Sequence, residues 1–271
     1  MAVPVYCGDS RSEKEIYFFM KRSNGELKGM ARQMLLGHYQ VPMLAILLSS
    51  LIPSLFLLPF NYLCSDRNTI ITQAILYYLA SFIIALIELL LNCGVNRIHL
   101  LIARGQQAQV SDMFWVVKNR PDRILIGGFL FTLITWIPMI PSFVFDLRTP
   151  ETLSTANYAV ISVLLSLGGT AIGFLITLPL YFAFWIYAED PDIDTREAFR
   201  RSISLTRGAK WRLFLMGLSF IGWSVLGALS FGIGFLWILP YMNQALTNFY
   251  LELKQEFDVK VEFSEVAQGY M

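Results

Sequence analysis

The sequence is poor in charged residues. Only 15% of its 271 residues are charged, while 55% are hydrophobic and the mean hydropathy is +0.54. A soluble domain carries about 25% charged residues. A charge at the centre of a bilayer costs about 2.5–3.5 kcal/mol, so a chain dissolved in lipid keeps few of them. The shortage argues against an ordinary soluble domain and predicts an integral membrane protein.

Cysteine and histidine are also scarce. Cys7, Cys64 and Cys93 show no paired spacing, which gives neither a disulfide framework nor a metal motif, and we interpret them as free thiols. His38 and His99 are too few for a catalytic or zinc cluster. The sequence contains no GxSxG, P-loop, HExxH or nucleotide-binding fingerprint. We therefore expect a non-enzymatic protein with no cofactor, no metal and no nucleic-acid partner.

Six apolar runs stand out along the chain. An apolar helix of about 20 residues crosses a hydrocarbon core of about 30 Å. The runs cover about 40–62, 70–92, 123–145, 156–187, 212–230 and 232–251. We expect the second helix to continue to about residue 105. No apolar segment at the N-terminus suits a secretory signal, so the first run is expected to be retained. The sequence predicts an all-α, polytopic membrane protein with six transmembrane helices arranged as three hairpins.

A short amphipathic segment precedes each hairpin. The three segments are 26–36, 111–119 and 195–207, and their apolar and basic residues lie on different faces, as in helices lying along a membrane surface. In the first, Lys28 and Arg32 lie off the apolar face. A soluble packing helix has the same pattern, but entry into the membrane at His38 favours the interfacial interpretation. Candidate capping residues support these starts: Ser12 with Glu15, Ser23 with Glu26, Ser111, Asp192, Asp194 and Thr195.

The basic residues predict the orientation. Only Arg67 and Arg148 lie in the loops expected on one side, so 21 − 2 = 19 Lys and Arg residues lie on the other. By the positive-inside rule, both termini are cytoplasmic. We expect three regions: cytoplasmic and interfacial helices over 1–38, the transmembrane domain over 39–253, and a cytoplasmic tail over 254–271. Within the tail, the alternation of DVKVEF suggests a short strand or a flexible segment.

The order of surface helix, outgoing span and returning span occurs three times, which suggests an internal repeat. Each returning span carries a residue that loosens a helix near the inner leaflet: Gly94, Pro179 or Pro240. Gly169 and Gly173 form a GxxxG motif, which permits close helix contact but is also common by chance.

Three blocks of sequence carry a family resemblance. They are LKGMARQMLLGHY at 27–39, DPDIDTREAFRRSISLTRGAKWRLFLMGLSFIGW at 190–223, and FGIGFLWILPYMNQALTNFYLEL at 231–253. They resemble a bacterial integral membrane family, domain of unknown function 975 (DUF 975), which is common in Firmicutes. The chain is also distantly similar to the membrane domain attached to some glycerophosphodiester phosphodiesterases, although no catalytic domain of that kind fits in it. The resemblance implies the bacterial cytoplasmic membrane and supplies no activity.

The candidate site is a set of polar residues in the second and sixth spans. Glu88 is the one acid inside an expected span, and an ionisable residue there suggests function. On a helical wheel Glu88, Asn92 and His99 lie within about 40° of one another, with Asn96 nearby. The sixth span offers a matching polar surface: Asn243, Gln244 and Asn248.

Two interpretations of this set stay open. In the first, the amides serve only to join helices through hydrogen bonds, with Glu88 protonated by burial. Alternatively, the residues line a polar intramembrane cavity around Glu88. The first favours a scaffold or accessory subunit that contacts membrane lipids and another membrane protein. The second favours a small transporter or lipid-handling protein.

Overall fold

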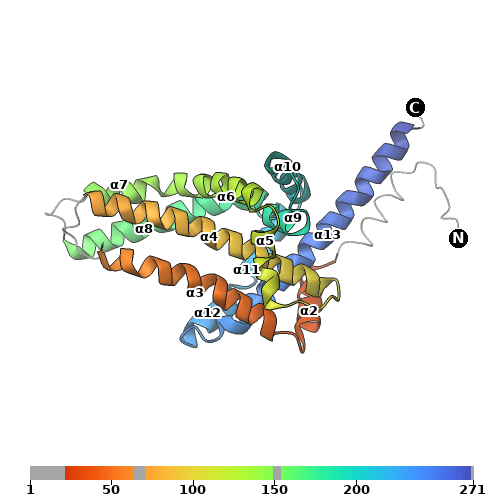
Figure 1. Ribbon diagram of the computed structural model, residues 1–271, viewed down its shortest axis with the longest axis horizontal. Coiled ribbons are helices and arrows are strands. Elements are labelled where there is room, and N and C mark those ends of the chain that lie inside the picture. The colour runs from red at the N-terminus through yellow and green to blue at the C-terminus, as the bar shows by residue number, and fades with distance from the viewer. Residues whose placement is uncertain (1–21, 64–70, 149–153, 270–271) are drawn as a thin grey trace.

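All regular structure in the described residues is helical. The computed structural model describes residues 22–63, 71–148 and 154–269, and every element there is an α-helix or a short 3-10 helix (Figure 1). The predicted all-α fold is confirmed for these ranges. Ser12, Glu15, Cys7, Cys64 and Arg67 lie outside them.

The first unit follows the predicted order closely. Its helices are α2 (Asn24–Leu35), α3 (Gln40–Leu63) and α4 (Ile71–Ala103). The expected capping box is present: the Ser23 hydroxyl accepts from the Glu26 amide, and the Glu26 carboxylate accepts from the Ser23 amide. Pro53 lies inside α3. As expected, α4 continues well past residue 92 as one helix.

The second unit is more broken than its sequence suggests. It comprises η1 (Val110–Phe114), α5 (Trp115–Lys118), α6 (Pro121–Trp136), η2 (Ile137–Met139), α7 (Ile140–Arg148) and α8 (Thr155–Thr177). The N-cap of η1 is Gln109, so the prediction of Ser111 was wrong. Pro138 lies in η2 and lacks an amide hydrogen, which explains why the third apolar helix is interrupted there.

The third unit departs furthest from the prediction. Its elements are η3 (Leu178–Leu180), α9 (Ala183–Glu189), α10 (Thr195–Thr206), α11 (Lys210–Leu218), α12 (Ile221–Leu229) and α13 (Phe235–Gly269). The fourth apolar helix ends near Pro179 instead of 187, because that residue interrupts the α-helical hydrogen bonds. Asp194 caps α10. The tail is helical as far as Gly269, so the expectation of a strand or flexible segment was wrong.

Five helical segments are long and apolar enough to cross a membrane. They are Gln40–Phe60, Ile75–Ala103, Pro121–Asp146, Ala156–Leu180 and Lys210–Leu229, the last interrupted by the turn between α11 and α12. The chain is thus compatible with a multi-pass membrane protein. The sixth expected span, within α13, is not among the five. Asn243, Gln244 and Asn248 interrupt its apolar run and lower its mean hydropathy.

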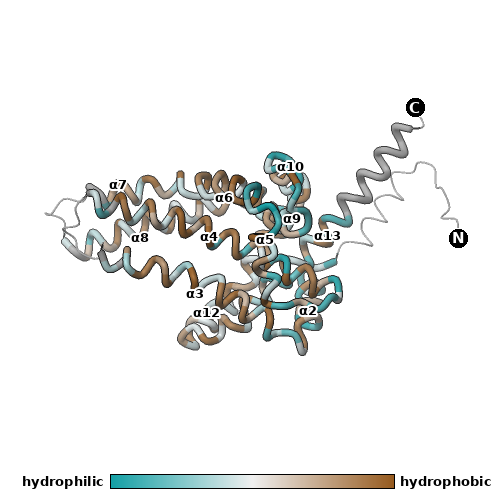
Figure 2. Tube along the Cα trace, viewed as in Figure 1, coloured by the Kyte–Doolittle hydropathy of each residue, from teal (hydrophilic) through white to brown (hydrophobic). Residues whose placement is uncertain are grey.

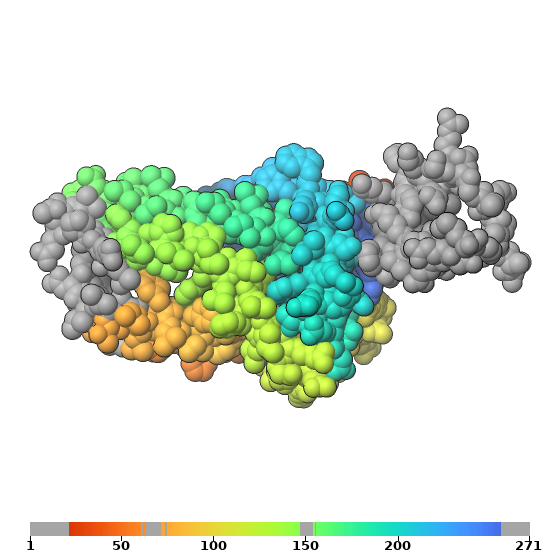
Figure 3. Space-filling model, turned by 90° about the horizontal axis from the view of Figure 1, so that it is seen from above, coloured from red at the N-terminus to blue at the C-terminus, as the bar shows by residue number. Residues whose placement is uncertain are grey.

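The long apolar helices and the surface segments occupy opposite ends of the molecule. α3, α4, α6, α7 and α8 extend together to one end, and α2, α5, α9 and α10 gather at the other (Figure 1). Neighbouring helices pack as α3 on α4, α4 on α6, and α6 on α8. Brown apolar residues mark the long helices, and teal polar residues concentrate among the surface segments (Figure 2). In Figure 3 the surface of α10, in teal, lies at the end of the molecule away from the tips of α7 and α8. We call α2, η1–α5, α9 and α10 the collar.

α13 forms the centre of the polar end. It packs against α2, α3, α4, α10 and α12. Nearly all of its side chains between Gln244 and Leu253 are buried, among them Phe249 and Tyr250. An internal helix can carry amides that would be costly against lipid, because neighbouring helices supply hydrogen-bond partners. This position explains why α13 is the least apolar of the expected spans.

The GxxxG motif lies at a close helix contact. A Cβ atom added at Gly169 would lie 2.7 Å from the carbonyl oxygen of Pro138, and one at Gly173 would lie 3.5 Å from that of Thr135. A Cβ at neighbouring Gly168 would meet nothing within 4 Å. Gly169 therefore lets α8 approach the backbone of η2, while Gly168 has no such role.

We predict that Gly169→Ala destabilises the protein and that Gly168→Ala does not. The first change forces the backbones apart, with an overpacking cost of about 1–3 kcal/mol. The second fills open space and gains helix propensity, by about 0.5–1 kcal/mol. Thermal unfolding of the two variants in the same detergent measures the difference. Equal melting temperatures would contradict this account of the contact.

Candidate functional site

His99, Gln244 and Asn248 meet in a buried chain of hydrogen bonds between α4 and α13. His99 Nδ1 lies 2.9 Å from Gln244 Oε1, and Gln244 Nε2 donates to the backbone carbonyl of His99 at 3.3 Å. Gln244 Nε2 also lies 3.4 Å from Asn248 Oδ1, and Asn248 Nδ2 donates to the carbonyl of Leu27 at 3.2 Å. His99 and Gln244 are fully buried. The chain links α4, α13 and α2 through side-chain amides.

Asn96 and Asn243 lie beside this chain in different ways. Asn96 is buried on α4, whereas Asn243 is half-buried on α13. The carbonyl of Asn243 accepts from the Thr247 hydroxyl, which in turn accepts from Trp185 Nε1 at 2.9 Å. This second polar contact ties α9 to α13. The predicted polar surface of the sixth span is therefore used mainly in packing.

Glu88 and Asn92 lie apart from the buried chain. Both side chains are exposed on α4, and within the described ranges Glu88 makes no hydrogen bond or ion pair. Glu88 lies eleven residues before His99, about 16 Å along the helix. α13 begins nine residues before Gln244, and these nine residues cover about 13 Å along the helix.

The structure therefore divides the predicted set. It brings together His99, Gln244 and Asn248, with Asn96 and Asn243 alongside. It does not bring Glu88 to the polar residues of α13, because those residues lie at the level of His99, about 16 Å along α4 from Glu88. That a cavity surrounds Glu88 stays a prediction.

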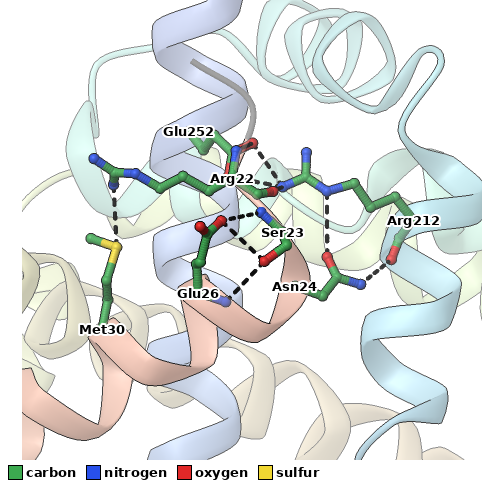
Figure 4. Close-up of polar contacts among 7 residues, drawn as sticks. All are labelled: Arg22, Ser23, Asn24, Glu26, Met30, Arg212 and Glu252. Carbon is green, nitrogen blue, oxygen red and sulfur yellow. Dashed lines mark hydrogen bonds and ion pairs between the residues drawn. The ribbon is translucent and has the colours of Figure 1, made fainter. Parts of the chain in front are cut away.

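A charged cluster at the start of α11 was not predicted. Arg212 Nη2 lies 2.7 Å and 2.8 Å from the two carboxylate oxygens of Glu252 on α13. The same nitrogen donates to the carbonyl of Arg22 at 2.6 Å, and Arg212 Nε donates to Asn24 Oδ1 at 3.3 Å (Figure 4). The side chains of Arg212 and Glu252 are 16% and 6% exposed. The Arg212 guanidinium also lies over the Phe249 ring, 4.6 Å from its centroid.

A second charged cluster centres on Glu189, at the end of α9. Its carboxylate forms ion pairs with Arg104 and Lys254 and accepts from the Tyr250 hydroxyl. Only 10% of the Glu189 side chain is exposed. Nearby, Arg97 donates to the carbonyl of Ala188 at 3.1 Å. The cluster joins the ends of α4 and α9 to α13.

The two charged clusters hold helices together. Each carboxylate faces a cation from another helix, and charges removed from water are stabilised only when they are paired in this way. The described residues hold no group of three or more His, Cys, Asp or Glu side chains suited to a metal ion. Cys93 is a buried free thiol whose sulfur lies 3.2 Å from the carbonyl oxygen of Phe184. Sequence reasoning overlooked Glu189 and Glu252. Each stands near basic residues in the sequence, and the sequence alone does not distinguish such an acid from one that faces water.

We predict that Arg212→Met destabilises the protein strongly. The change removes the buried cation that contacts both oxygens of the Glu252 carboxylate, at a cost of about 3–5 kcal/mol. Replacing both partners, with Arg212→Met and Glu252→Leu, should recover much of that loss. Thermal unfolding in detergent measures both.

Arg201→Gln is the matched control. Arg201 pairs with Glu197 at 3.0 Å, with the two side chains 52% and 34% exposed. Removing such a surface pair should cost less than about 1 kcal/mol. If Arg212→Met lowered the melting temperature no more than Arg201→Gln does, the Arg212–Glu252 pair would contribute no more to stability than an exposed ion pair.

Comparison with known proteins gives one match. The family model described as "Protein of unknown function (DUF975)" matches residues 20–256. No curated protein and no solved structure matches the chain. The distant similarity to the membrane domain of glycerophosphodiester phosphodiesterases therefore stays a prediction.

Proposed function

The chain belongs to the DUF975 family of proteins of unknown function, and we propose that it is a scaffold or accessory subunit of the bacterial cytoplasmic membrane. In this proposal it catalyses no reaction and acts through contacts with lipids and with another membrane protein. The buried chain from His99 through Gln244 to Asn248 carries the proposal. A transport pathway needs polar groups that reach water, whereas these are buried and, apart from Nε2 of His99, hydrogen-bonded to one another or to the backbone.

We further propose six crossings with both termini in the cytoplasm. In this arrangement α11 and α12 make the fifth crossing, and the first half of α13 makes the sixth. The collar then lies along the cytoplasmic face. The distribution of basic residues supports this orientation, because the described surface helices that carry Lys and Arg, α2, α5 and α10, belong to the polar end.

Labelling of single cysteines tests this topology. In a background without the three native cysteines, a membrane-impermeant thiol reagent added outside the cell should label Arg67→Cys and Arg148→Cys. It should leave Lys118→Cys and Arg201→Cys unlabelled until the membrane is opened. The reverse pattern would invert the topology, and labelling of all four would exclude it.

A second candidate function rests on Glu88. This side chain is exposed within the candidate span Ile75–Ala103, and Asn92, one turn away, is exposed as well. Ionisable residues in membrane spans commonly mark a pathway for ions or substrates. A small transporter or a lipid-handling protein would use this polar face of α4, and Glu88 would exchange a proton or bind a headgroup there.

The purified chain in liposomes separates the two candidates. If the protein is a scaffold, the parent should move neither lipid nor solute above the rate of empty liposomes, and Glu88→Gln should assemble like the parent. In its native membrane, crosslinking before extraction should then recover a membrane protein in fixed ratio to the chain. Lipid or solute transfer by the parent that Glu88→Gln abolishes, with folding unchanged, would establish the second candidate instead.

A further inference from the structure

Two basic side chains on α2 have no carboxylate partner in the part of the chain that the structure describes. Lys28 and Arg32 lie one turn apart and form no ion pair within the described ranges. Six other basic residues of the polar end do have such a partner, namely Arg104, Arg120, Arg200, Arg201, Arg212 and Lys254, whereas Lys118, Arg196, Arg207 and Lys210 have none in the described ranges. Lys28 is half-buried, and burial lowers the pKa of its ammonium group because the charged form loses water. An anion placed beside Lys28 would restore that lost stabilisation.

Aromatic rings lie beneath both cations. Lys28 Nζ lies 4.4 Å from the ring centroid of Phe220, at the turn between α11 and α12. The Arg32 guanidinium lies 6.0 Å from the ring centroid of Tyr241 on α13. Tyr241 packs edge-on against Phe220 at 5.5 Å and against Trp223 at 6.4 Å. Cation–π contacts of this kind hold the two positive charges over two rings that are themselves in contact.

The surroundings match the level of lipid headgroups. α2 leads within a few residues to Gln40, where the first candidate span begins. Trp223 is 44% exposed and Trp237 is 51% exposed. Tryptophan and tyrosine are enriched where a membrane meets water. Lysine and arginine there lay their apolar stems on the protein and direct their charges toward phosphates.

We propose that Lys28 and Arg32 together bind the phosphate of one anionic phospholipid. Trp223 and Tyr241 then contact its glycerol and the first carbons of its acyl chains. The site is built from α2, the α11–α12 turn and α13, so a bound lipid bridges the collar to the third hairpin. This inference rests on the membrane placement proposed above.

Lipid binding to the full-length chain tests the site. Protein in a neutral detergent is titrated with phosphatidylglycerol or phosphatidylcholine, and bound lipids are counted by native mass spectrometry. Each basic residue near a phosphate contributes roughly fivefold in affinity, so the double variant Lys28→Gln and Arg32→Gln should bind phosphatidylglycerol about 25-fold more weakly. Phosphatidylcholine binding should change little.

Arg200→Gln with Arg201→Gln provides the matched control. It removes the same charge from another collar helix, where both residues already pair with Glu197. This control should retain the affinity of the parent. Equal weakening in the two double variants, or no weakening in the first, would overturn the proposal. Displacement of the lipid by an equal concentration of inorganic phosphate would overturn its assignment to a lipid.

The outcome is separable from that of the proposed topology. If a variant loses lipid binding but keeps its cysteine-labelling pattern and elutes as a single species, only the lipid site has been affected. A reversed labelling pattern in the parent would refute the membrane placement, whatever the lipid affinities.

Discussion

Burial of polar side chains on α13 is the constraint on which the rest of the fold depends. An amide in contact with acyl chains costs several kcal/mol unless it is hydrogen-bonded. Gln244 and Asn248 avoid that cost because His99 and the carbonyl of Leu27 lie within bonding distance. α13 must therefore lie inside, surrounded by α2, α3, α4, α10 and α12.

The collar follows from this central position. Short surface helices would be unstable alone in water, since most of their stability comes from packing an apolar face. α2 buries Leu27, Ala31 and Leu35, and α10 buries Ala198 and Leu205. The clusters around Glu252 and Glu189 then tie α11, α4 and α9 to the same central helix. The polar end is consequently a closely connected unit.

The closed polar end and the exposed face of α4 around Glu88 suit different functions. The polar end is closed by internal contacts, which suits a rigid platform. About 16 Å further along α4, the helix exposes the carboxylate of Glu88 and the amide of Asn92. A scaffold would use the first region and a transporter the second. Lys28 and Arg32 lie near the boundary, where a lipid would join the third hairpin to the collar.

Much of the fold could be predicted from composition and pattern. The long apolar runs placed α3, α4 and α8 within a few residues of their ends, except where Pro179 stops the α-helix early. The capping box at Ser23 and the N-cap at Asp194 were predicted because their hydrogen bonds span only three residues or fewer. Both kinds of signal are local, so neighbouring residues are enough to specify them.

The candidate site could be predicted only in part. Periodicity placed Glu88, Asn92 and His99 on one face of a helix, which is a local property. Which residues of the partner helix come level with that face is not a local property. Gln244 on α13 comes level with His99, so His99 gains a partner and Glu88 does not.

The sequence by itself determined an apolar, all-α chain with cation-rich surface helices, because hydropathy and helix periodicity are properties of consecutive residues. Only the tertiary structure decided which charges are paired. Arg212 and Glu252 are 40 residues apart, and Arg104 and Glu189 are 85 apart. Lys28 and Arg32, by contrast, meet aromatic rings instead of carboxylates. Partners of this kind depend on how whole helices pack, which no short stretch of sequence encodes.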